Sequence, residues 1–476
     1  MIRLLEENYR KMEQIIQVLS ISDKWMTKKE LAKEIGSSES TFIRYMEDIK
    51  IRWGTKIPIE TSNKLGYRIE HFNVSTYLDI LMDMAQSSTN SQLLHEIIMK
   101  PGQTIEYYCE TLSISRSSFT RKLKRCNEIL DTYLLKIIVD QGFQLTSKAS
   151  ELQLRMFVTY FFLNFYGRYD LPYTIDKTMV KSIVERNNGQ TSLYEQGSTY
   201  EQSFFVMYFM VHLLREMQGF YLNNGSNKPT RKVYELDKED YLLLKKNLTD
   251  LSYASYAKVI DYFTQSIFQQ FSSSEQKEIR EKIQRNLQIC TFSKMNEWSS
   301  DNMDFIVHLL TNIYFFSRMF PFDTTHLTYR ASFFAEQIKV RHITLYARFR
   351  EELQFFSTLL ETNFLNYLPS YIFWMLIINP ETNQSLDTKR ILIVSDLGIH
   401  HSRYVGSYVS DVLSVYHVHS ITEAITEEQL TSFDLTDYDL VISNQPISNN
   451  TKVPSLLIDD SLSFKDEEDL INLFGL

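Results

Sequence analysis

Residues 33–53 read KEIGSSESTFIRYMEDIKIRW, and residues 110–130 read ETLSISRSSFTRKLKRCNEIL. When Phe42 is aligned with Phe119, the two stretches agree in their apolar positions, in a serine before the helix and in a surface arginine. A repeat of this length rarely arises by chance. It predicts that one structural unit occurs twice within the first 150 residues, with the copies about 77 residues apart.

The residues around each copy predict a winged helix-turn-helix. Thr27 and Glu30 form a capping-box pattern that begins a short helix, and Gly36 ends that helix. Ser38 is a favourable N-cap for the next helix, whose apolar stripe includes Phe42. Two β-prone runs around a turn follow, IPIETSNKLGYRIE at residues 57–70, and the second copy ends similarly in KIIVDQGFQLT at 136–146.

This architecture predicts DNA binding, because a recognition helix enters the major groove, where hydroxyl groups and arginines contact phosphates and bases. Cations concentrate in the second copy, which has no acid between Arg116 and Glu128. We therefore expect the second recognition helix to supply the main electrostatic contact, although a basic helix face can also be merely solvated. The expected DNA-contacting residues face outward from the two helices and the first wing: Ser38, Ser40, Thr41, Arg44, Tyr45, Lys64, Arg68, Arg116, Ser117, Ser118, Arg121, Lys122, Lys124 and Arg125.

The net charge of −9 is unevenly distributed. Lys and Arg exceed Asp and Glu by two in residues 1–150, whereas Asp and Glu exceed Lys and Arg by nine in residues 388–476. Cys109, Cys126 and Cys290 lack the spacing of a zinc site or a disulfide framework. No apolar run is long enough to span a bilayer. These features predict a cytoplasmic protein with no cofactor, no metal and no enzymatic activity, whose acidic tail contacts protein rather than DNA.

Residues 151–387 are expected to form almost continuous amphipathic helices, and they contain a second internal repeat. FMVHLL at 209–214 recurs as FIVHLL at 305–310, so that His212 and His308 occupy matched places. A single histidine on an apolar helix face is usually a core residue, whereas a partly exposed neutral imidazole can accept a phosphoryl group. Both interpretations stay open for this pair. His326 and His342 have no repeat partner and are expected to be structural.

The last 89 residues alternate between strand and helix patterns. RILIVSD at 390–396, VYHVHSI at 415–421, DYDLVISN at 437–444 and SLLIDD at 455–460 are the expected strands, with a helix from TEEQL at 426–430. They predict a small parallel sheet, in which a loop after the first strand is a natural anion site. No cysteine lies near that loop, and His400 and His401 are expected to be structural or exposed.

The predicted fold class is therefore multidomain and mainly α-helical, with a small α/β domain at the C-terminus. The expected domains are a first winged helix-turn-helix at 1–72, a second at 73–150, helical domains at 151–273 and 274–387, and the α/β domain at 388–476.

This order of parts resembles the Mga/AtxA family of virulence regulators from Gram-positive bacteria. The resemblance implies that the two helical domains are PRDs, the regulatory domains targeted by the sugar phosphotransferase system, and that the tail is similar to a IIB component. It further implies phosphorylation of His212 and His308 by HPr or a related donor, binding to promoter DNA, and homodimerisation through the tail. A IIB enzyme carries a phosphorylated cysteine in its first loop, whereas this chain has Ser395 and Asp396 there. The tail is therefore expected to be an interaction module without phosphoryl-transfer chemistry.

The leading hypothesis is a dimeric DNA-binding activator tuned by histidine phosphorylation. One alternative is a phosphotransferase-type relay in which the head only tethers the chain to DNA. A PRD-type antiterminator that binds RNA is disfavoured, because the sequence shows no aromatic platform for RNA bases.

Overall fold

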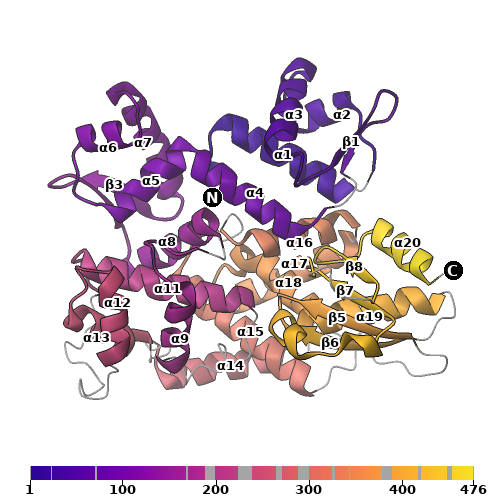
Figure 1. The fold of residues 1–476 in the computed structure, drawn as a ribbon. Helices are drawn as coiled ribbons and strands as arrows, with labels where there is room; N and C mark the ends of the chain where they lie inside the picture. The colour runs from indigo at the N-terminus through magenta and orange to yellow at the C-terminus, as the bar shows by residue number, and fades with distance from the viewer. Residues whose placement is uncertain are drawn as a thin grey trace.

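The computed structural model describes most of the chain (Figure 1). The described residues are 2–22, 24–69, 72–167, 170–187, 199–222, 238–263, 271–287, 300–323, 327–341, 343–377, 389–415, 420–447 and 453–474. His326 and His342, which the sequence assigns structural roles, lie outside them.

The first unit is a group of short helices followed by a hairpin. It contains a 3₁₀ turn η1 (Ile2–Leu4), α1 (Glu7–Ser22), α2 (Lys28–Glu34), α3 (Glu39–Trp53), β1 (Ile59–Ser62) and β2 (Gly66–Ile69). The capping box of Thr27 and Glu30 is present at α2, and Gly36 has the positive φ that the turn before α3 requires. Strands β1 and β2 pair in antiparallel fashion.

The second unit repeats this arrangement with α4 (Val74–Ser87), α5 (Thr89–Met99), α6 (Ile105–Thr111), α7 (Arg116–Asp131), β3 (Leu135–Val139) and β4 (Phe143–Ser147). The likeness extends to a glycine at the start of the returning strand, where Gly66 is the first residue of β2 and Gly142 directly precedes β4. A Cβ atom on Gly66 would lie 2.1 Å from the carbonyl oxygen of Met26, and one on Gly142 would lie 2.1 Å from that of Gly102. Each hairpin is therefore held against the same point of its own unit.

The middle of the chain is helical, as expected. Its described helices are α8 (Glu151–Tyr166), α9 (Lys177–Asn187), α11 (Thr199–Met217), α12 (Lys238–Asn247), α13 (Tyr253–Phe263), α14 (Ser273–Leu287), α15 (Ser300–Met319), α16 (Tyr329–Arg341), α17 (Ile343–Leu359), the 3₁₀ turn η3 (Phe364–Tyr367) and α18 (Leu368–Ile377). None of the described helices combines the length and apolarity needed to cross a membrane.

The C-terminal region is a parallel sheet of order β6-β5-β7-β8 with helices around it. Its elements are β5 (Lys389–Ser395), α19 (Ile399–Val415), β6 (Ser420–Thr426), the 3₁₀ turns η4 (Glu427–Ser432) and η5 (Leu435–Asp437), β7 (Leu440–Ser443), β8 (Ser455–Leu457) and α20 (Phe464–Leu473). The predicted second strand at 415–421 was misplaced, because α19 continues to Val415 and β6 begins only at Ser420. The helix expected from residue 426 is the 3₁₀ turn η4.

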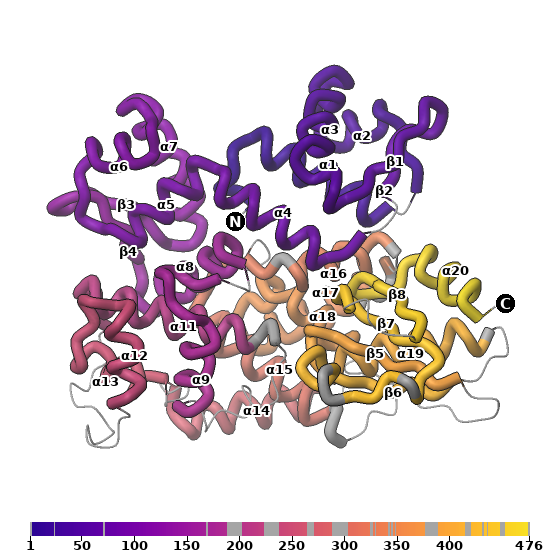
Figure 2. The backbone as a smooth tube through the Cα atoms, viewed as in Figure 1, coloured from indigo at the N-terminus to yellow at the C-terminus, as the bar shows by residue number. Residues whose placement is uncertain are grey.

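The two N-terminal units lie on one side of the molecule, and α4 runs between them and the helical middle (Figure 2). One hydrophobic core extends from Leu4 in the first unit to Phe333 in α16. Helix α8 follows directly on the hairpin of the second unit and packs against both α4 and α11. The N-terminal units are thus joined to the helical middle by shared packing rather than by a free linker.

Candidate nucleic-acid interface and regulatory residues

The starts of α3 and α7 have the same local geometry. Ser38 Oγ accepts the backbone N–H of Thr41 at 3.2 Å and lies 3.0 Å from Ser40 Oγ. Ser115 Oγ accepts the N–H of Ser118 at 3.2 Å and lies 3.0 Å from Ser117 Oγ. Both helices lie on the side of the molecule away from the helical middle (Figure 1). The serines at both helix starts, Ser38, Ser40, Ser115 and Ser117, are exposed, as contacts to DNA require.

The cations of α7 differ in how they are engaged. Arg116 forms an ion pair with Glu106, and Arg125 pairs with Glu128 at 3.2 Å. Arg121 and Lys124 are exposed, and no described residue forms an ion pair with either of them. These two side chains carry the positive charge that is most available to a phosphate backbone.

Lys122 does not face outward, which corrects the sequence-based expectation. Its side chain is only 15% exposed and its ammonium group lies 2.8 Å from Glu6 Oε1, which belongs to the segment before α1. Because Glu6 lies 116 residues from Lys122, this pairing could not be predicted from the residues around Lys122. Lys122 joins the two N-terminal units to each other.

In the first unit Tyr45 is also misassigned, because its side chain is buried in the core at 8% exposure. Arg44 is exposed and lies over the Tyr45 ring at 5.4 Å. In the hairpin, Lys64 is exposed, whereas Arg68 bonds Glu60 at 2.7 Å and lies over the Trp25 ring at 5.2 Å. The two recognition helices differ in charge rather than in free cations, because α3 carries three acids beside its three cations, whereas α7 carries two acids beside five cations.

His212 lies in α11 and has no exposed surface. Its Nδ1–H donates to the carbonyl oxygen of Tyr208 at 2.9 Å, and its ring stacks on Tyr262 with 4.8 Å between centroids. Burial, together with the charge of Arg155, holds the pKa of His212 well below its usual value. The imidazole is therefore neutral, but a donor outside the protein cannot reach it without an opening of the helices.

His308 lies in α15 and is only partly buried. Burial, with the charge of Arg280, lowers the pKa of His308. The repeat thus places both histidines on long helices, and it is His308 that combines a neutral ring with access to solvent.

The sequence did not reveal a buried polar cluster at the carboxyl ends of β5 and β7. Arg330 of α16 donates to both oxygens of Asp396 at 2.7 Å and to the two oxygens of Asp460 at 2.8 and 3.0 Å. Asn444 Nδ2 donates to Asp396 at 3.0 Å and to Asp460 at 3.1 Å. Burial alone would lower the pKa of Arg330, but the two carboxylates raise it well above its usual value. The guanidinium group is permanently charged here.

This cluster lies where an α/β domain usually binds its ligand. The sheet order changes direction between β5 and β7, and ligands of open parallel sheets bind at such a point beyond the carboxyl ends of the strands. Arg330, a residue of the helical middle, fills that position in this chain. The loop expected to attract an anion is lined instead by two carboxylates that hold an internal cation.

Ser395 and His401, both buried, support the same loop. Ser395 Oγ donates to His401 Nδ1 at 2.7 Å, and His401 Nε2–H donates to the carbonyl oxygen of Asp460 at 2.8 Å. Burial lowers the pKa of both His401 and its half-buried neighbour His400. His401 therefore acts as a neutral bridge between α19 and the segment after β8.

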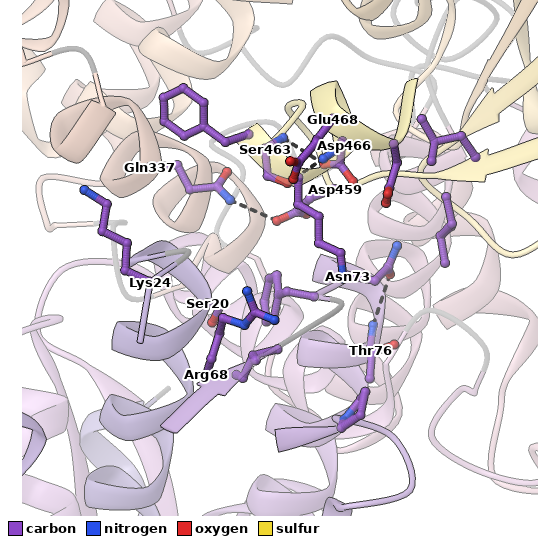
Figure 3. A pocket seen from close by; sticks show the side chains of 18 of the residues that line it. Ser20, Lys24, Arg68, Asn73, Thr76, Gln337, Asp459, Ser463, Asp466 and Glu468 are labelled. Carbon is purple, nitrogen blue, oxygen red and sulfur yellow. Dashed lines mark hydrogen bonds between the residues drawn. The ribbon is translucent and has the colours of Figure 1, made fainter. Parts of the chain in front are cut away.

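A groove of about 930 Å³ separates the first N-terminal unit from the C-terminal domain (Figure 3). Its lining from the first unit includes Lys24, Lys56 and Arg68, and its lining from α20 includes Asp466 and Glu468. Asn73, Gln337 and Asp459 also line it, which places the junction of three parts of the chain at the groove.

Residues 74–162 match the family model of the Mga helix-turn-helix domain. This match supports membership of the Mga/AtxA family of regulators. The matched segment begins at the first residue of α4 and ends within α8, so the Mga domain includes the second unit and the helix that packs on α11. The Mga helix-turn-helix indicates a DNA-binding transcriptional regulator. No curated protein matches this chain.

Proposed function

We propose that this Mga-family chain is a promoter-binding transcriptional activator that contacts DNA with two winged helix-turn-helix modules. The observation that carries the proposal is α7 of the matched domain, where Ser117, Arg121 and Lys124 are exposed and no described residue forms an ion pair with either cation. The equivalent geometry at α3 supports a second, weaker contact. The module at α7 supplies most of the attraction to phosphates, and the module at α3 mainly positions the protein.

Mobility shifts on an AT-rich duplex at several salt concentrations test this proposal. The double variant Arg121→Ala with Lys124→Ala should bind more weakly and should lower the slope of log affinity against log salt by about one for each lost phosphate contact. The matched control removes two exposed cations from the helical middle, Lys277→Ala with Arg350→Ala, and should leave both affinity and slope unchanged. Equal affinities and equal salt slopes for the two double variants would show that α7 does not contact the DNA.

The helical middle would act as a pair of PRDs that receive phosphoryl groups from HPr or a related donor. The exposure of the two candidate histidines supports His308 as the acceptor in the folded chain and a core role for His212. A phosphoryl group adds between one and two negative charges, which is enough to change how neighbouring helices dock.

Incubation with phosphoenolpyruvate, enzyme I and HPr, followed by mass spectrometry, tests the acceptor. We expect label on the chain that His308→Ala abolishes and His212→Ala leaves in place. Label that depends on His212 in the folded protein would contradict this assignment. Label that passes onward to a sugar or to another protein would favour a relay over a regulator.

The C-terminal domain would hold two copies of the chain together. Its edge strand β8 and the neighbouring α20 carry Leu457, Phe464 and Leu473, which are 46%, 72% and 47% exposed. Exposed apolar side chains on adjacent elements are typical of an interface. A second copy of the chain is the proposed occupant.

A further inference from the structure

We infer that the Arg330 cluster and Asn73 are positioning residues that fix the two DNA-binding modules relative to each other. This inference rests on the proposed DNA-binding function. The cluster is here named the latch, and it consists of Arg330, Asp396, Asp460, Asn444, Asp459, Gln337 and Asn73. It ties the start of α4 to the C-terminal domain, about 385 residues further along the chain.

The start of α4 is seated directly on the carboxyl ends of the sheet. Asn73 Nδ2 donates to the carbonyl oxygens of Asn444 at 3.1 Å and of Ile458 at 3.3 Å. The backbone N–H of Val74 donates to Asp459 Oδ1 at 3.2 Å, and Ser75 Oγ donates to Gln445 Oε1 at 3.1 Å. Two residues thus use side-chain groups, and one uses its backbone, to attach the first turn of α4 to a different domain.

Helix α16 completes the attachment through one face. Arg330, Phe333 and Gln337 follow one another at helical spacing along it. Arg330 binds Asp396 and Asp460, Phe333 stacks on Phe72 at 5.0 Å between centroids, and Gln337 Nε2 donates to Asp459 Oδ2 at 2.9 Å. The same face of one helix therefore binds both the C-terminal domain and the residues that precede α4.

Helix α4 is the connection between the two modules. Strand β2 of the first module ends at Ile69, and α4 begins the matched Mga domain at Val74. Because both recognition helices lie on the same side of the molecule (Figure 1), a fixed α4 keeps them arranged to meet one duplex. Two linked modules gain affinity from each other only if their geometry allows both to bind at once. The latch fixes α4 against the C-terminal domain and so contributes to that geometry, beside the Lys122–Glu6 contact between the two modules.

The variant Asn73→Asp distinguishes the contacts of Asn73 within the latch from its role as the N-cap of α4. The aspartate keeps the N-cap role, because Asn73 Oδ1 accepts the N–H groups of Ser75 and Thr76, but it loses the two donors to Asn444 and Ile458. It also adds a carboxylate beside Asp459. Asn73→Ser is the milder second variant, since serine also caps helices but is too short to make these contacts. Asn363→Asp is the matched control, because Asn363 is an exposed N-cap with no contact to another domain.

Two measurements on the full chain decide the question. Hydrogen exchange without DNA should become faster in residues 72–80 and 455–462 of both Asn73 variants, and should be unchanged in the control. Mobility shifts should compare an AT-rich duplex of about 30 base pairs with one of about 12, because adjacent major-groove sites lie about 10 base pairs apart. We expect roughly tenfold weaker binding to the long duplex only.

The outcomes are distinguishable. Unchanged hydrogen exchange in both Asn73 variants would mean that the contacts of Asn73 do not hold the start of α4 on the C-terminal domain. Faster exchange with unchanged affinity for the long duplex would mean that these contacts do not position the two modules. Either result overturns the inference, as would a gain in affinity. If the unaltered chain binds neither duplex, the proposed function fails and the positioning role with it, while exchange still reports whether the latch fixes α4.

Discussion

At the scale of single residues, the first module contains an acid in an unusual place. Glu13 of α1 is 2% exposed, and its carboxylate accepts a hydrogen bond from the hydroxyl of Tyr77 in α4. Burial raises the pKa of Glu13 to about 7, although the hydrogen bond from Tyr77 acts in the opposite direction. A buried acid at the contact between α1 and α4 makes that contact depend on pH.

The direction of this dependence follows from the two pKa values. Below about pH 4.5 the carboxyl is protonated in both the folded and the unfolded chain, and the contact has its full stability. Between about pH 4.5 and about pH 7 the unfolded chain has released this proton while the folded chain keeps it, so the fold progressively loses about 3 kcal/mol, at 1.36 kcal/mol per pKa unit. Glu13→Gln should therefore unfold at a higher temperature than the unaltered chain at pH 8, but not at pH 5.

Thermal unfolding of both proteins between pH 5 and pH 8 measures this effect. Glu7→Gln is the control, because Glu7 lies on the same helix and is exposed. Parallel curves for Glu13→Gln and Glu7→Gln would show that Glu13 does not titrate in this range.

At the scale of elements, the sequence predicted what depends on local periodicity. The capping box at Thr27, the N-caps at Ser38 and Ser115 and the glycine turn at Gly36 each act within a few residues, and all are present. The misplacement of β6 has a local cause as well. The β-branched and aromatic residues from Val415 onward favour a strand, but packing against the sheet carries α19 through Val415.

Contacts between residues far apart in the chain produce no local sequence pattern from which they could be predicted. Lys122 and Glu6 are 116 residues apart, and Arg330 is 66 residues from Asp396 and 130 from Asp460. Nothing in the sequence around Arg330 distinguishes it from a surface arginine on an amphipathic helix. Only the fold shows that it is buried, and a buried charge of this kind requires partners.

At the scale of the whole molecule, the acidic tail has two different surfaces. The carboxyl ends of its sheet are covered by α4 and α16 of the same chain, so this surface is already occupied. The side formed by β8 and α20 retains the exposed residues Leu457, Phe464 and Leu473. Leu457 and Phe464 of this second surface also line the groove that faces the first N-terminal unit, and we propose that a second copy contacts this surface.

The proposed dimer can be tested by charge at that surface. Phe464→Glu with Leu473→Glu should lower the fraction of dimer measured by light scattering, because two carboxylates would replace apolar contact area on each copy. Ile343→Glu is the control, since Ile343 is 70% exposed but lies on α17 in the helical middle. A dimer that survives the double variant, or one that the control disrupts equally, places the interface elsewhere.

The contact between Asn73 and residues 444 and 458 also has a genetic consequence. Alleles that alter the codons of Asp459 and Asp460 should be recovered in screens for lost promoter recognition, although neither residue belongs to a recognition helix. Suppressors of such alleles should map to the codons for the start of α4 or for α16. In this chain, the order of codons is a poor guide to which mutations share a phenotype.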